Sequence, residues 1–90
     1  MTTMTLPVQT DTEVLAVVEA TPYGRVATLE LRRAIRHQTQ AARPDTWDSP
    51  DRWNGPVTLG RNRLAQRYNI PAADPMVAAC ERAIRTEMED

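Results

Sequence analysis

The chain has 90 residues and a formal net charge of −1, so it has room for one small domain and not for a second core. Its 16 Leu, Ile and Val residues are fewer than one fifth of the chain and Phe is absent, which gives a thin core. The low net charge excludes disorder driven by charge repulsion, and no apolar run approaches the length of about 18 residues that a membrane span needs. We therefore expect a small globular domain that gains stability from a partner or from self-association.

The ends of the chain and its cysteine content indicate where it works. The N-terminus lacks a basic start followed by a hydrophobic stretch, so no secretory signal is visible. The single cysteine, Cys80, excludes an internal disulfide, which fits a reducing compartment. We expect a cytoplasmic protein whose residues 1–9 form a flexible tail and whose residues 10–90 form the domain.

The positive charge is concentrated in the middle of the chain, and arginine carries all of it because lysine is absent. Residues 1–23 have a net charge of −3, residues 24–67 of +5 and residues 68–90 of −3. Two interpretations stay open. The middle segment attracts a polyanion to one face of the domain, or the acidic ends fold onto the arginines and neutralise them.

The first predicted helix covers residues 11–20. Thr10 and Glu13 have the spacing of a capping box ahead of an apolar run, which favours a helix over a buried strand. The residues Thr-Pro-Tyr-Gly at 21–24 are typical of a helix stop followed by a turn.

A second helix is predicted over residues 28–42, after a short extended connector at 25–27. Thr28 has the character of an N-cap, and Leu31 and Ile35 fall on one apolar face. The opposite face is either an ordinary solvated surface or a set of phosphate contacts, and its candidate residues are Arg32, Arg33 and Arg36.

Residues 44–60 are predicted to be a long loop rich in tryptophan and proline. Loops of this length inside a compact domain are usually functional or flexible. Residues 55–60 are the candidate for one short strand, hairpin or wing, after the turn signal Asn-Gly-Pro. Trp47 and Trp53 either fold back to complete the thin core or remain exposed as aromatic anchors for a partner.

Two closely spaced helices are predicted at the C-terminal end, over residues 61–69 and 75–88. Asp74 followed by Pro75 is a strong N-cap signal for the second of them. The first helix carries arginines on its outer side, and these are further candidates for phosphate contacts: Arg61, Arg63 and Arg67.

Signals for catalysis or metal binding are weak. His37 and Cys80 are the only residues of their types, and no clustered ligand set accompanies them. Three scattered glycines provide no phosphate-binding loop, and the regularly spaced aspartates at 45, 48 and 51 do not match a calcium loop. We expect a non-enzymatic protein without cofactor or metal.

The segment 59–84, LGRNRLAQRYNIPAADPMVAACERAI, resembles a helix-turn-helix of the winged-helix DNA-binding superfamily. Ala65 matches the small residue at which the two helices approach, and Ile70 matches the apolar residue that fills the turn. Asn69 stands where the family usually has glycine, and Pro75 stands where it has an apolar residue. The resemblance implies a DNA-binding regulator whose second helix enters the major groove.

The sequence therefore predicts a mostly α domain of three to four helices, with a helix-turn-helix-like pair and a short hairpin or wing. The leading hypothesis is a small DNA-binding or DNA-associated regulator that contacts phosphates through its arginine face. The alternative is a protein–protein adaptor, inhibitor or assembly subunit that uses the tryptophan loop to bind a protein partner or a second copy.

Overall fold

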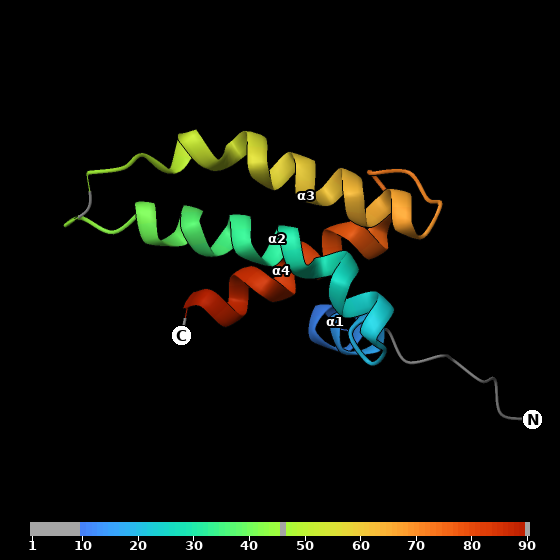
Figure 1. Ribbon diagram of the computed structural model, residues 1–90. Helices are drawn as coiled ribbons and strands as arrows, with labels where there is room; N and C mark the ends of the chain where they lie inside the picture. The colour runs from blue at the N-terminus through green and yellow to red at the C-terminus, as the bar shows by residue number, and fades with distance from the viewer. Residues whose placement is uncertain (1–9, 46, 90) are drawn as a thin grey trace, which may run out of the picture.

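The computed structural model of the protein describes residues 10–45 and 47–89; the expected flexible tail at residues 1–9 lies outside them. The described part is a small all-α domain with no strand (Figure 1). In chain order its elements are α1 (Asp11–Val18), α2 (Pro22–Ala41), the short 3₁₀ helix η1 (Pro50–Trp53), α3 (Asn54–Arg67) and α4 (Pro75–Glu89).

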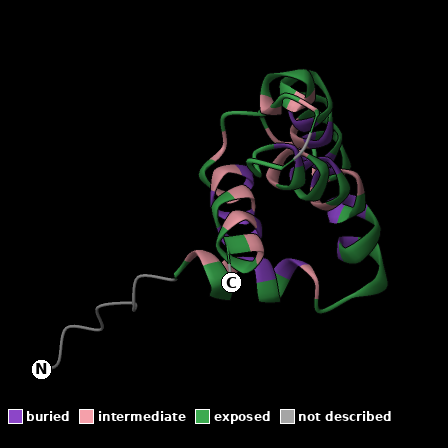
Figure 2. Ribbon diagram, turned by 90° about the vertical axis from the view of Figure 1, so that its left-hand side faces the viewer, coloured by how far each residue is buried: buried purple, intermediate pink, exposed green. Residues whose placement is uncertain are grey.

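The helices form two layers. Helices α2 and α3 lie antiparallel and side by side, and α4 crosses on one side of them with α1 packed against it (Figure 1). The core lies between the layers, and Figure 2 shows the outer sides of the helices as largely exposed. Each of the four α-helices contributes to the core, whose buried leucine, isoleucine and valine side chains are Leu15, Val18, Leu31, Ile35, Val57, Leu64, Val77 and Ile84.

Helix α1 begins where the capping signal predicts. The backbone N–H of Glu13 donates to Thr10 Oγ1 at 3.2 Å, so one of the free N–H groups of the first turn is satisfied. The helix ends at Val18, two residues before the predicted end, and the turn at 19–21 leads directly into α2.

The prediction that α2 starts at Thr28 is wrong, because the helix already begins in the Thr-Pro-Tyr-Gly segment at 21–24. Thr21 is the N-cap, with its Oγ1 accepting from Gly24 N–H at 3.2 Å, and Pro22 occupies the first turn, where no N–H donor is required. The predicted connector at 25–27 is therefore helical. Thr28 is fully buried, and its hydroxyl donates to Glu19 Oε2 at 2.6 Å.

The predicted long loop at 44–60 is also shorter than expected, because η1 starts at Pro50 and α3 starts at Asn54. The side-chain amide of Gln38 donates to Asn54 Oδ1 at 2.8 Å, which ties the start of α3 to α2. The predicted strand or wing at 55–60 is wrong. Val57 lies in the first turn of α3 and is buried in the core, and this burial of apolar surface stabilises the helical conformation of the segment.

The connection between α3 and α4 has the hydrogen bonds of a Schellman motif. Ile70 N–H donates to Ala65 O at 3.0 Å, and Asn69 N–H donates to Gln66 O at 3.1 Å. Asn69 has a φ of 54°, the left-handed conformation that asparagine tolerates better than most residues. The predicted cap of α4 is confirmed by a bond of 2.9 Å from Met76 N–H to Asp74 Oδ1.

Helices α2 and α3 approach each other closely at Gly60. A Cβ atom at Gly60 would lie 2.7 Å from Leu31 Cα, closer than two carbon atoms can pack. Gly60 is buried, whereas Gly55, one turn earlier on α3, has no neighbouring atom within 4 Å of such a Cβ. Glycine is thus required at residue 60 by packing and is not required at residue 55.

The substitution Gly60→Ala should lower the free energy of unfolding by about 1–3 kcal/mol, because the added methyl group forces α2 and α3 apart. Gly55→Ala is the matched control and should leave this free energy unchanged or raise it by up to about 1 kcal/mol, because alanine favours the helix. Urea denaturation followed by circular dichroism measures both. Equal stability of the two variants would contradict the close approach.

Candidate functional site

Arg32 lies between the two layers and is held by acidic residues from both ends of the chain. Its guanidinium contacts Glu19 Oε1 at 2.6 Å and Glu87 Oε2 at 2.5 Å, and its side chain is only 24% exposed. Burial on its own would lower the pKa of Arg32, but hydrogen bonds to the two carboxylates outweigh burial and raise it. A phosphate contact at Arg32 would have to compete with both ion pairs.

Arg61 is paired across the layers in a similar way. Its Nε lies 3.0 Å from Glu81 Oε1, off line for a hydrogen bond, and Glu81 also binds Arg85 through its other oxygen at 3.0 Å. The second interpretation of the charge pattern therefore applies to Arg32 and Arg61, which acidic residues near the ends of the chain neutralise.

The other predicted arginines lie on the outer side of α2 and α3. Arg63 forms an ion pair with Glu30, and Arg67 lies over the ring of Tyr23 at 5.8 Å from its centroid. Arg33 and Arg36 are exposed, and neither makes an ion pair or hydrogen bond within residues 10–45 and 47–89. The six candidate arginines thus separate into an inner pair and an outer group of four.

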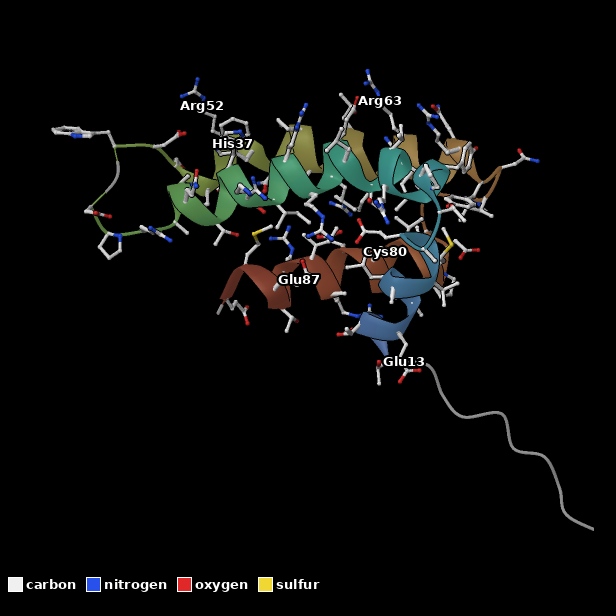
Figure 3. The ribbon with its side chains drawn as sticks, turned by 60° about the horizontal axis from the view of Figure 1, so that its bottom comes forward. Glu13, His37, Arg52, Arg63, Cys80 and Glu87 are labelled. Atoms are coloured by element: carbon white, nitrogen blue, oxygen red, sulfur yellow. The ribbon has the colours of Figure 1, made fainter. Side chains whose placement is uncertain are left out.

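Two adjoining depressions follow the outer seam between α2 and α3, and we call them together the α2/α3 groove. Their volumes are about 210 and 200 Å³, and Glu30 and Arg33 line both of them. Figure 3 shows His37 and Arg63 on this outer side, pointing away from α4. The remaining residues that line the groove and enter the argument below are Val26, Leu29, Trp53, Leu59 and Arg67.

The two predicted anchor residues have different environments. Trp47 is fully exposed between α2 and η1. Trp53 is half-buried at one end of the groove, where its ring stacks on His37 at 4.6 Å between centroids and 13° between planes. Its indole N–H donates to Asp48 Oδ2 at 3.0 Å. The alternative in which both tryptophans complete the core is therefore wrong.

Helix α4, the second helix of the helix-turn-helix-like segment, presents few cationic groups. Seven residues, 68–74, separate α3 from α4, and α4 packs mainly on α1 and α2. Its two arginines are both paired, with Arg82 bound to Asp11 and Arg85 bound to Glu81. Its apolar side, formed by Val77, Cys80 and Ile84, is buried in the core, and Met88 is half-buried beside it.

The residues with catalytic or metal-binding potential are not brought together. Cys80 lies buried between the layers, where burial raises the pKa of its thiol to about 11, whereas His37 lies on the outer side (Figure 3). Within residues 10–45 and 47–89, no group of three or more His, Cys, Asp and Glu side chains has an arrangement that could hold a metal ion.

Comparisons with protein-family models, with curated proteins and with solved structures find no match to this chain. None of the helices in the described parts of the chain is long and apolar enough to cross a membrane.

The contact between Asp48 and Trp53 gives the groove an acid-sensitive end. The Trp53 indole N–H, then the Ser49 backbone N–H, hold the pKa of Asp48 below its ordinary value of 3.8. Because the folded carboxyl has the lower pKa, its stabilisation is fully present above pH 3.8 and is lost as the pH falls through the lowered value.

In a Trp47→Phe background, the emission of Trp53 should therefore change as Asp48 is protonated below pH 3.8. Asp48→Asn, which keeps an oxygen acceptor but has no charge to lose, should remove this titration. Far-UV circular dichroism at each pH separates the local change from unfolding. An identical titration in Asp48→Asn would show that Asp48 does not cause it.

Proposed function

We propose that this protein is a non-enzymatic interaction module that binds a protein partner through the α2/α3 groove. The observation that carries the proposal is the apolar lining of an exposed seam. Val26, Leu29 and Leu59 are 52%, 42% and 47% exposed, although all three are large hydrophobic residues on neighbouring turns of two packed helices.

The composition of the groove supports a protein partner. Protein interfaces combine an apolar and aromatic centre with a polar rim in which arginine is enriched. The groove has this arrangement, since its aliphatic residues and Trp53 lie beside Arg33 and Arg67. Trp47, fully exposed on the segment that leads to η1, provides a further aromatic group for contact. The one cysteine is buried and reduced, and we propose a cytoplasmic location.

The test is a comparative capture of partners by the full chain from a lysate of the source cells, quantified by mass spectrometry. A groove partner should be depleted at least about tenfold by Leu59→Ser and by Trp53→Ala, because each substitution removes an anchor. Val17→Ser is the matched control, since Val17 is 64% exposed on α1 and does not line the groove.

Circular dichroism should show that the three variants keep the wild-type fold, because none of the three residues belongs to the buried core. Partners that are captured equally by all variants are unrelated to the groove. If no protein is lost selectively with the groove variants, and size-exclusion chromatography with light scattering shows a monomer throughout, the proposal is wrong.

A specific observation also favours DNA binding as a second candidate function. Helices α2 and α3 together carry seven arginines and one acidic residue, Glu30, which makes this layer strongly cationic although the whole chain is slightly acidic. In this candidate the outer arginines bind phosphate oxygens, and the helix-turn-helix-like pair α3 and α4 positions the domain on the duplex. The side chains available for phosphate contact without breaking an ion pair across the layers are Arg33, Arg36, Arg63 and Arg67.

Fluorescence titration with labelled duplex DNA at about 50 and 200 mM salt tests this candidate. Binding that uses four phosphate contacts should have a log–log salt slope of about −3.6. Arg33→Glu and Arg36→Glu should then weaken DNA binding alike, because both side chains are exposed and unpaired within the described residues. Absence of binding at the lower salt concentration would exclude DNA as the partner.

A further inference from the structure

We propose that the partner segment bound by the α2/α3 groove is an amphipathic α-helix with an apolar ridge and acidic flanks. This inference rests on the function proposed above and specifies the chemistry of the partner. Three properties of the groove carry it: its length and direction, its apolar lining, and the sign of the charge along it.

The shape of the groove suits a helix. The groove follows two antiparallel helices, and on α2 it extends from Val26 to His37, about 16 Å or three helical turns at 1.5 Å per residue. A third helix packed along the seam between two others is a common solution in helical domains. The described chain has no strand and so offers no sheet edge to which an extended peptide could add.

The apolar lining defines the ridge that the partner presents. Val26 and Leu29 lie on α2, and Leu59 and Trp53 lie on the opposite side of the seam. These side chains are spread along the groove, so a helical partner buries them when its apolar residues recur at every third or fourth position. Such a ridge is the anchor pattern of a helix seated in a groove.

The charge along the groove defines the flanks of the partner. Glu30 is the only acidic residue that lines the groove, and its carboxylate is already bound to Arg63. Arg33 has no partner in the described structure, and Arg67 has only the face of the Tyr23 ring besides its backbone contact. Both guanidiniums are therefore available to carboxylates, which arginine can bind through two parallel hydrogen bonds.

Other occupants from the same chain fit less well. Residues 1–9 contain no Asp or Glu and so lack the complementary charge. In a second copy, the acidic helix α4 turns its apolar residues into its own core, and its exposed residues after the first turn are polar. Helix α1 exposes only Val17 as a large hydrophobic residue, which is too little for a ridge of three turns.

The probe for this inference is a synthetic helical peptide of about 14 residues, about 21 Å long, which matches the groove with a margin. It carries Leu along one face, Glu on both flanks and a side-chain lactam on the far face to hold the helix, because short helices are marginal in water. A control peptide has the same Leu face with Lys in place of every Glu. The full chain with Trp47→Phe reports binding through Trp53, the one tryptophan left.

The acidic peptide should bind at least about tenfold more tightly than the basic peptide at low salt, because the groove discriminates by charge. Leu59→Ser and Arg33→Glu should each weaken its binding by about tenfold or more. Two matched controls lie outside the lining: Val17→Ser for the loss of an apolar side chain and Arg36→Glu for the same reversal of charge on the same helix. Both should change the affinity by less than about threefold.

Three results of the peptide titrations would overturn the inference: no binding of the acidic peptide, equal binding of both peptides, or equal weakening by Arg33→Glu and Arg36→Glu. Self-association of the wild-type chain that Leu59→Ser abolishes would also overturn it, because the groove would then hold a second copy. The capture experiment separates this failure from failure of the proposed function. If the peptide fails while Leu59→Ser still depletes a captured protein, the groove binds a partner of different chemistry.

Discussion

The close approach of α2 and α3 at Gly60 is the constraint on which the rest of the fold depends. With no side chain at this position, the α3 backbone rests on Leu31, and the two helices stay in contact from the Gln38–Asn54 bond to the Tyr23–Tyr68 ring pair. This pair presents one side to α4 and the core and leaves the other side as a narrow seam. A wider separation would open the seam to water and would bring Val57 and Leu64 away from the core that they fill.

The features that the sequence predicted correctly are those that depend on interactions between residues close together in the chain. The cap at Thr10, the Asp74–Pro75 start of α4 and the left-handed Asn69 each depend on a few neighbouring residues. The errors arise where one local signal has two meanings. Threonine followed by proline can end a helix or cap the next one, and Pro22 does the second because the turn after α1 is short. The Asn-Gly-Pro segment likewise became the first turn of α3, since burial of Val57 outweighs its turn preference.

The candidate site was predictable only in part for a related reason. Composition and spacing identified the arginines, but not which of them the fold would neutralise. Arg32 meets Glu87 across 55 positions of sequence, a contact that only the packing of α4 on α2 creates. The groove itself was missed because five of its twelve lining residues lie in segments predicted to be a connector or a loop. Once 22–41 is treated as one helix, the spacing of Val26, Glu30, Arg33 and His37 places them on a single stripe.

The separation of charge between the layers gives the domain an electric dipole, with arginine-rich α2 and α3 at one pole and the carboxylates of α1 and α4 at the other. Guanidinium groups stay protonated throughout the physiological pH range, so this dipole hardly varies with the acidity of the surroundings. At physiological ionic strength its field extends only about 8 Å before salt screens it. The domain is therefore turned by the field of a charged molecule only when the two are within about that distance. An anionic molecule then meets the arginine-rich side of the domain first.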